Sequence, residues 1–136
     1  MEPHFISLEE ALLIHADAIR LYGGSSGIRD QGMLESALGA PQNLFAYHQA
    51  DDSVEGFALM AAAYWFHLTM NHPFIDGNKR ASFMCAVAFL QMNGWDLDIS
   101  YETGLESSIQ LTTHAISRDQ LADRLAHMIV PIALED

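Results

Sequence analysis

Apolar and polar residues repeat along most of the chain with the spacing of helices rather than strands. Two segments, residues 54–70 and 81–92, are apolar nearly all round, which predicts helices that are buried on most sides. Four further segments are expected to be helical. Their ranges are residues 8–21, 33–38, 102–114 and 118–131. The pattern therefore predicts an all-α bundle of about six helices with little or no β structure.

Capping residues mark where several of these helices begin and end. Ser7 and Ser117 each stand three residues before a Glu or Gln, a capping box that opens a helix. Asp30 is expected to cap the helix over residues 33–38, and Pro41 is expected to close that section. Local sequence signals thus predict where the first, second and last helices begin.

Two segments between the expected helices lack a helical repeat. Residues 41–53 show no clear period, and their apolar Leu44, Phe45 and Tyr47 fit either simple core packing or the flank of a site. Residues 95–99 alternate apolar and acidic side chains, which predicts a short extended piece.

Length and composition describe one globular domain over residues 1–136, with 50% hydrophobic and 18% charged residues. Six Lys and Arg against eighteen Asp and Glu give a net charge of −12, which argues against direct binding to nucleic acid or to an anionic membrane. We find no secretory or membrane-spanning pattern, and the single Cys85 cannot form an internal disulfide. A cytoplasmic setting fits best.

Charge is concentrated at one point of the most apolar part of the chain. Between residues 57 and 92 the only charged side chains are Asp76, Lys79 and Arg80. All three lie in residues 71–80, which join the two most apolar segments. Connections between helices are normally solvated surface loops, whereas this one also holds Phe74, which can anchor it in the core. This segment is the strongest candidate for a functional site.

The second half of this segment suits the binding of a phosphate. A helix that begins near Gly77 or Asn78 presents free backbone N–H groups and the positive end of its dipole. Lys79 and Arg80 add two cations to that end, an electrostatic cost that a bound anion relieves. Phosphate is the obvious anion for such a turn.

The first half supplies a base and a carboxylate that can bind a metal ion. Asp76 would repel a phosphate directly, but it fits if Mg²⁺ lies between the two. His72 precedes the turn, and because an imidazole titrates near neutral pH it can accept a proton from a hydroxyl. Taken singly, each residue also fits an ordinary cap or turn. The other histidines, His15 among them, have no pattern that supports a role.

Residues 72–83 resemble the signature of the Fic/Doc superfamily, whose Fic branch reads His-x-Phe-x-Asp/Glu-Gly-Asn-Gly-Arg-x-x-Arg. The run here is His-Pro-Phe-Ile-Asp-Gly-Asn-Lys-Arg-Ala-Ser-Phe. Lys79 stands in place of the second Gly and Phe83 in place of the last Arg, and the death-on-curing (Doc) toxins share both departures. Further stretches that are similar to Doc are Tyr22-Gly23-Gly24, residues 27–38, Asn93-Gly94 and Ile116-Ser117.

The resemblance implies a Fic-fold toxin of a type II toxin–antitoxin pair, restrained by a Phd-like antitoxin. It implies ATP and Mg²⁺ as cofactors. The implied roles are His72 as catalytic base, Asp76 as the Mg²⁺ ligand, and Gly77, Asn78, Lys79 and Arg80 as the residues that bind the ATP phosphates. Doc toxins phosphorylate a threonine of elongation factor Tu and so arrest translation. Two alternatives remain: AMP transfer to a protein hydroxyl, as in Fic proteins, or a non-enzymatic binding module with a decayed site.

Two sequence features bear on the choice of reaction and on how the protein is restrained. In Fic proteins the last Arg of the motif helps to hold the pyrophosphate that leaves during AMP transfer. With Phe83 in that position the pyrophosphate loses a bidentate partner, which favours phosphate transfer. Fic enzymes are also often restrained by a Ser/Thr-x-x-x-Glu-Gly/Asn segment. Here the residue four positions before Glu55 is Asp51, so we expect restraint by a separate antitoxin instead.

Overall fold

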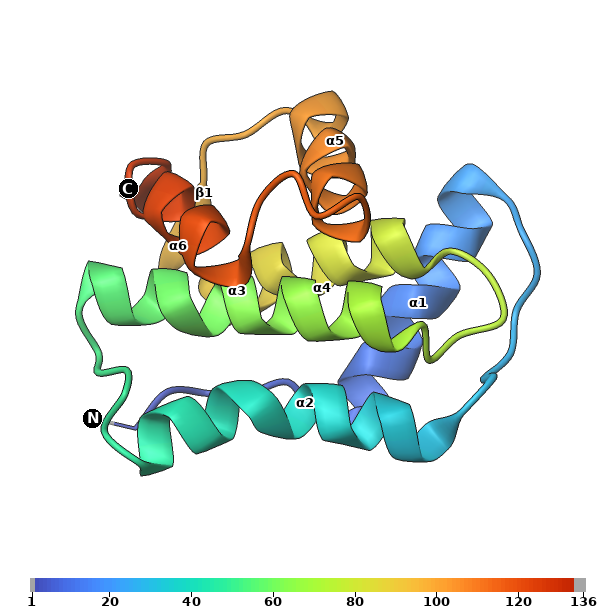
Figure 1. Cartoon of the computed structure of the whole chain (residues 1–136), viewed down its shortest axis with the longest axis horizontal. Helices are drawn as coiled ribbons and strands as arrows, with labels where there is room; N and C mark the ends of the chain where they lie inside the picture. Colours follow the sequence, from blue (N-terminus) through green and yellow to red (C-terminus); the bar gives the residue numbers. More distant parts are fainter. Residues whose placement is uncertain (1, 134–136) are drawn as a thin grey trace.

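The computed structural model describes residues 2–133, and in this range six helices and one small sheet make up the fold (Figure 1). The helices are α1 (Leu8–Tyr22), α2 (Gln31–Ala46), α3 (Val54–Asn71), α4 (Asn78–Met92), α5 (Tyr101–Thr112) and α6 (Arg118–Ala126). The strands are β1 (Trp95–Leu97) and β2 (Ile129–Pro131). The predicted all-α class is confirmed. No helix in the described range is both long and apolar enough to cross a membrane.

Helix α3 is the centre of the bundle, with α2 along one side and α4 and α6 packed on the others (Figure 1). Its residues 61–65 are fully buried, and the three alanines among them allow neighbouring helices to approach closely. The two large side chains of this stretch find polar partners: Tyr64 Oη accepts the Ile6 N–H at 2.9 Å, and Trp65 Nε1 donates to Ser108 Oγ at 2.7 Å. The polar atoms of both buried side chains are therefore hydrogen-bonded, although the helix is apolar on every side.

The predicted helix starts are confirmed by their caps. Ser7 and Ser117 each form a complete capping box, with the side chain accepting from one backbone N–H while the Glu10 or Gln120 side chain returns a bond. Asp30 caps α2 by accepting the Met33 N–H at 3.0 Å. These local bonds satisfy N–H groups that a helix start leaves without partners.

The prediction that Pro41 closes the second helix is wrong, because α2 continues through it to Ala46. Pro41 has no N–H to donate, so the helix gives up one internal hydrogen bond. However, Leu38, Pro41 and Leu44 are all buried on the face that packs against α3. Burial of that face outweighs the lost bond. Leu44 therefore belongs to the core, as simple packing predicts, whereas Tyr47 is exposed.

The prediction that the last helix extends to about Pro131 is also wrong. Helix α6 ends at Ala126, and the chain then forms β2, which pairs antiparallel with β1 (Leu97 opposite Ile129). The β-branched Ile129 and Val130 favour an extended backbone, and Pro131 is unfavourable inside a helix. Strand β1 falls within the predicted extended piece over residues 95–99.

Phe83, which replaces the last Arg of the Fic signature, points into the core. Its side chain is 7% exposed and stacks on Trp65 with ring centroids 5.1 Å apart. Helix α5 crosses directly over this ring: a Cβ placed on Gly104 would lie 2.5 Å from Phe83 Cζ. The absence of a side chain at Gly104 is what lets α5 rest on α4.

We therefore expect Gly104→Ala to lower the free energy of unfolding by about 1–3 kcal/mol, because the added methyl overpacks the α4–α5 contact. The measurement is urea denaturation followed by circular dichroism. The matched control is Gly39→Ala in α2, where nothing lies within 4 Å of the new Cβ. This control should be neutral or stabilising by up to about 1 kcal/mol, since Ala favours a helix over Gly. Equal stability of the two variants would contradict the packing described for Phe83.

Candidate active site

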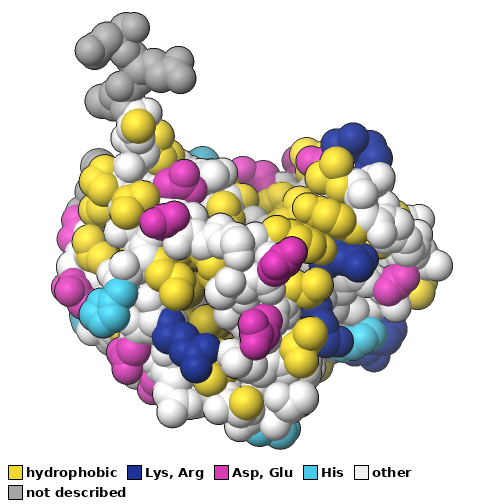
Figure 2. Space-filling model, turned by 90° about the horizontal axis from the view of Figure 1, so that it is seen from above, with side chains coloured by type: hydrophobic (Ala, Val, Ile, Leu, Met, Phe, Trp, Pro, Cys, Tyr) yellow, Lys and Arg dark blue, Asp and Glu magenta, His cyan; other side chains and the backbone are white. Residues whose placement is uncertain are grey.

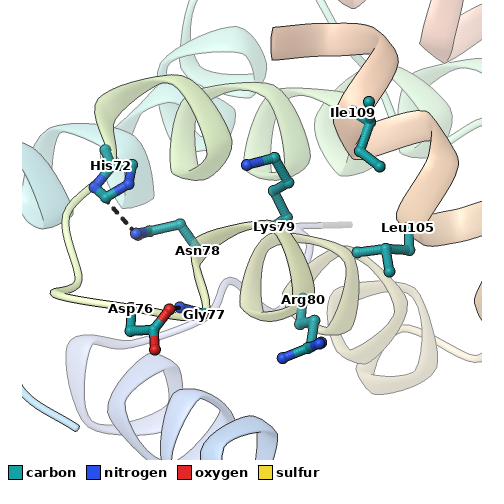
Figure 3. Close-up of a pocket in the computed structure, with 8 residues that line it drawn as sticks. All are labelled: His72, Asp76, Gly77, Asn78, Lys79, Arg80, Leu105 and Ile109. Carbon is teal, nitrogen blue, oxygen red and sulfur yellow. Dashed lines mark hydrogen bonds between the residues drawn. The ribbon is translucent and has the colours of Figure 1, made fainter. Parts of the chain in front are cut away.

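A cavity of about 320 Å³ opens where the α3–α4 connection meets α5 (Figure 3). The residues that line it are His72, Asp76, Gly77, Asn78, Lys79, Arg80, Leu105 and Ile109. All six candidates from the sequence thus surround one cavity, and their individual roles stay predictions. Leu105 and Ile109 were not among the candidates. They come from α5 and add an apolar wall, and no local signal shows which face of that helix turns to the cavity.

His72 ends α3 in the left-handed conformation, with φ 49° and ψ 53°. Its ring points toward α4, where Nδ1 lies 3.2 Å from Asn78 Nδ2 (Figure 3). The Asn78 amide is oriented by Phe74, since Oδ1 accepts the Phe74 N–H at 3.0 Å and Nδ2 donates to the Phe74 carbonyl at 2.9 Å. Asn78 Nδ2 is therefore a donor, and His72 Nδ1 accepts from it.

Phe74 fixes the connection in the core, as its place in the sequence predicts. Its side chain is 1% exposed, and its backbone forms both bonds to the buried Asn78 amide. Its ring also stacks on His15 of α1, with centroids 3.8 Å apart and planes 5° from parallel. The start of α4 and the end of α3 are thereby joined through one buried ring and one buried amide.

Asp76 is held as an ionised carboxylate by backbone donors. Oδ1 accepts the N–H of Gly77 at 2.9 Å, and Oδ2 accepts the N–H of Ser25 at 3.1 Å. The Ser25 bond and then the Gly77 bond lower the pKa of this carboxyl below its ordinary value. The loop after α1 passes so close to this carboxylate that position 24 has no room for a side chain. A Cβ on Gly24, whose φ is +112°, would lie 2.6 Å from Asp76 Oδ2.

The two cations leave the first turn of α4 in different directions (Figure 3). Lys79 is exposed, and Arg80 is half-buried against two tyrosines. The Arg80 guanidinium lies 5.4 Å from the Tyr22 ring centroid, and its Nε donates to Tyr101 Oη at 2.9 Å. Within residues 2–133 neither cation forms an ion pair. Two positive charges that form no ion pair within that range therefore stand at the positive end of a helix dipole, where an anion is stabilised.

A buried chain of hydroxyl groups fixes the backbone at Lys79. The Lys79 carbonyl accepts from Ser108 Oγ at 3.0 Å and from Ser82 Oγ at 2.9 Å. Ser82 in turn bonds Thr69 Oγ1 at 2.6 Å. The start of α4 is thus tied to α3 and to α5 immediately behind the cavity.

Two residues that support the site have no signal in the sequence. His15 of α1 is 4% exposed, and its Nε2 lies 2.8 Å from the Asp76 carbonyl oxygen. Since a carbonyl only accepts, Nε2 carries the hydrogen. Arg29, in the loop after α1, donates from Nε to the His72 carbonyl at 2.6 Å and from Nη2 to the Asn71 carbonyl at 2.8 Å. Both contacts join positions more than 40 residues apart, so no local pattern reports them.

The donor set fits Mg²⁺ only if phosphate oxygens complete the coordination. Within the described residues no three His, Cys, Asp or Glu side chains gather as a metal site. Asp76 offers a single ionised carboxylate at the cavity. Mg²⁺ is commonly held by one or two carboxylates together with substrate phosphates and water. A magnesium nucleotide therefore suits this site better than the free ion.

The sequence model of the Fic/DOC family matches residues 5–90. The Toxin Doc of Mycolicibacterium smegmatis is 31% identical over 111 residues, which cover 77% of this chain and 80% of that protein. The chain therefore belongs to the Fic/DOC family, whose enzymes transfer nucleotide or phosphate groups to proteins.

Solved structures with the same fold come from Bartonella. The N-terminal Fic domain of a putative cell filamentation protein of Bartonella quintana, with bound ADP, is 27% identical, with a TM-score of 0.54 over 74% of this chain and 47% of that chain. BepC of Bartonella tribocorum, with bound AMPPNP, is 22% identical, with a TM-score of 0.55 over 76% of this chain and 49% of that chain. This chain spans about half the length of either solved chain.

His15→Phe is expected to lower the free energy of unfolding by about 1–3 kcal/mol, because it keeps a ring against Phe74 but leaves the Asp76 carbonyl without its donor. The control is His127→Phe at the exposed end of α6, which should change stability by less than about 0.5 kcal/mol. Chemical denaturation of both variants measures the difference. A His15→Phe variant as stable as the control would show that the bond to Asp76 carries no weight.

Proposed function

We propose that this chain is the toxin of a type II toxin–antitoxin pair and transfers the γ-phosphate of Mg-ATP to a protein hydroxyl. The target is a threonine of a translation protein such as elongation factor Tu, and the transfer arrests translation. The observation that carries the proposal is the convergence of His72, Asp76 and two unpaired cations on one cavity at the start of α4. Similarity to a protein named Toxin Doc supports it.

The phosphate groups bind at the N-terminus of α4. The turn at Gly77, with φ +76°, and the following backbone N–H groups would bind the anion, while the exposed Lys79 adds an ammonium. Arg80 is oriented in advance, since its Nε is engaged by Tyr101 and its two terminal nitrogens stay available for phosphate oxygens. Asp76 would hold Mg²⁺, which neutralises charge on the transferred phosphate when bound.

His72 is the base in this reaction. The target hydroxyl oxygen bonds to the γ-phosphorus, the bond from phosphorus to the β–γ bridging oxygen breaks, ADP leaves, and the hydroxyl proton passes to the imidazole. In the structure Nδ1 accepts from Asn78, so the neutral ring carries its hydrogen on Nε2. The ring must therefore either change tautomer, which frees Nε2 to accept the proton, or turn so that Nδ1 faces the hydroxyl, and either change gives up the Asn78 contact.

Transfer of phosphate is favoured over transfer of AMP by the position of Phe83. AMP transfer needs a group that holds the departing pyrophosphate, and the Fic signature supplies an Arg at this position. Here Phe83 is packed between Trp65 and Gly104 and lies outside the cavity. No second guanidinium from this position of the motif reaches the phosphates, which weakens the grip on a pyrophosphate.

AMP transfer remains the alternative reaction. The run Asp76-Gly77-Asn78 follows the Fic form of the motif. Solved Fic relatives also hold adenine nucleotides, ADP in one and AMPPNP in another. A binding module with a decayed site is the second alternative, and it is disfavoured because His72 and Asp76 are intact.

The partners we propose are proteins. A Phd-like antitoxin restrains the toxin in the cytoplasm, and the phosphorylated protein is its substrate. Direct binding to nucleic acid or membrane is not expected from a net charge of −12. On the face drawn in Figure 2, basic side chains are separated by hydrophobic and acidic ones rather than joined in a continuous basic surface.

Separate labels on ATP distinguish the two reactions. The protein is incubated with Mg²⁺, elongation factor Tu and ATP that carries radioactive phosphate at either the α or the γ position. We expect label on the target from γ-labelled ATP alone. Label from α-labelled ATP would replace phosphate transfer with AMP transfer. Absence of label from both would remove elongation factor Tu as the target under these conditions.

His72→Ala is expected to lower the transfer rate by about 10²–10⁴-fold, the usual contribution of a general base. The control is His127→Ala, which removes an exposed imidazole from the end of α6 and should leave the rate unchanged. The same pair of variants is compared for growth arrest on induced expression. A His72→Ala variant that still arrests growth fully would favour the binding module.

A further inference from the structure

The backbone at His72 is held in a conformation that it would not adopt by itself. Its φ of 49° and ψ of 53° are left-handed, a conformation that brings Cβ too close to the following carbonyl oxygen and is unfavourable for a residue with a side chain. The next residue is Pro73, and a residue before proline prefers an extended backbone over a helical one. Both effects push the same backbone away from the observed geometry, so contacts from outside the α3–α4 connection must maintain it.

Those contacts come from the loop between α1 and α2. The Arg29 guanidinium bonds the carbonyl oxygens of Asn71 and His72, at 2.8 and 2.6 Å. The backbone N–H groups of Arg29 and Asp30 bond the Pro73 carbonyl, at 2.7 and 3.0 Å. Three consecutive carbonyl groups, from the last residue of α3 to Pro73, are therefore satisfied by two consecutive residues of this loop.

The geometry of the guanidinium contact has a specific effect on His72. The Asn71 carbonyl lies in the peptide plane before the His72 Cα, and the His72 carbonyl lies in the plane after it. Rotation about φ and ψ of His72 is what changes the angle between these two planes. A rigid planar fork that bonds both oxygens thus fixes φ and ψ together. Its positive charge also lies at the negative end of the α3 dipole.

We propose that Arg29 is a positioning residue for the reaction. Its side chain bridges the two peptide planes that flank His72 and so directs the imidazole toward Asn78 and the cavity. Arg29 does not line the cavity and touches the reacting groups only through the His72 backbone. This inference rests on the proposed role of His72 as the base.

The test compares three variants of the full chain. Arg29→Met removes both donors and keeps an aliphatic side chain. Arg29→Lys keeps the charge but has no planar fork to bridge two carbonyls. The control, Arg20→Met, removes the same charge from α1, where Arg20 pairs with Asp17 at 3.4 Å on an exposed surface. Because Arg29 is exposed, Arg29→Met should keep the helical circular dichroism of the parent protein.

We expect Arg29→Met to lower kcat for transfer about tenfold with KM for ATP within about twofold of the parent. The phosphate-binding groups lie on α4, whose start is held by Asn78 and His15 independently of Arg29. Arg29→Lys should fall between the parent and Arg29→Met, and Arg20→Met should match the parent. Unchanged kcat in both Arg29 variants, or a rise in KM for ATP with kcat intact, would overturn the proposal.

A second measurement separates this inference from the proposed function. In isotope-labelled protein without nucleotide, the Cα and Cβ chemical shifts of His72 report its backbone conformation. They should move toward the values of an extended residue in Arg29→Met, less so in Arg29→Lys, and not at all in Arg20→Met. Unchanged His72 shifts in Arg29→Met would refute the positioning role whether or not the parent protein transfers phosphate. A parent protein that transfers no label but shows these shifts would instead count against the proposed function alone.

Discussion

The site depends on one buried amide. Asn78 bonds both backbone groups of Phe74 and also donates to the ring of His72. A single side chain thereby closes the α3–α4 connection, lies at the start of the helix that is proposed to bind phosphate, and orients His72, the proposed base. Buried amides that satisfy several partners in this way specify one geometry, since any alternative leaves polar groups without bonds. The apolar helices on either side supply the rigid frame for that arrangement.

The positive charges at the start of α4 favour the binding of an anion in the cavity. Three of the six Lys and Arg residues of an otherwise acidic chain, Arg29, Lys79 and Arg80, are gathered around this connection. Arg29 lies where a helix dipole favours a cation, whereas Lys79 and Arg80 lie where it disfavours one. The charge of Arg29 therefore stabilises the fold, whereas the charges of Lys79 and Arg80 favour the binding of an anion in the cavity. The ionised Asp76 beside them is stabilised by backbone N–H groups instead of by an ion pair.

The sequence alone predicted the parts of the structure that depend on local signals. Capping residues such as Ser7 and Ser117 and the apolar pattern of α3 and α4 are local, and they gave the helix starts and the core correctly. Pro41 misled because tertiary burial of its helix face outweighs a lost hydrogen bond. The end of α6 was missed because strand β2 exists only through pairing with β1.

The sequence named six of the residues that line the cavity, but it named none of the residues that support them from other elements. Residues 72–80 are contiguous, so their chemistry can be interpreted together from the order of the residues alone. His15 and Arg29 bond to this segment from 61 and 43 positions away in the sequence. A local sequence pattern does not show which distant residues come into contact in the fold. Leu105 and Ile109 were missed for the same reason, since the side of α5 that meets the cavity is decided by Phe83 beneath Gly104.

The α3–α4 connection carries the motif, whereas α1 and the loop after it support the backbone of that connection. This arrangement has an evolutionary consequence. A relative could keep every letter of the motif while losing the Gly24 close approach, the His15 bond or the Arg29 fork. Such a protein would carry intact reactive groups on an unsupported backbone. Surveys that grade members of this family as active or inactive by the motif alone would misclassify it, whereas scoring the first thirty residues together with the motif would separate the two kinds.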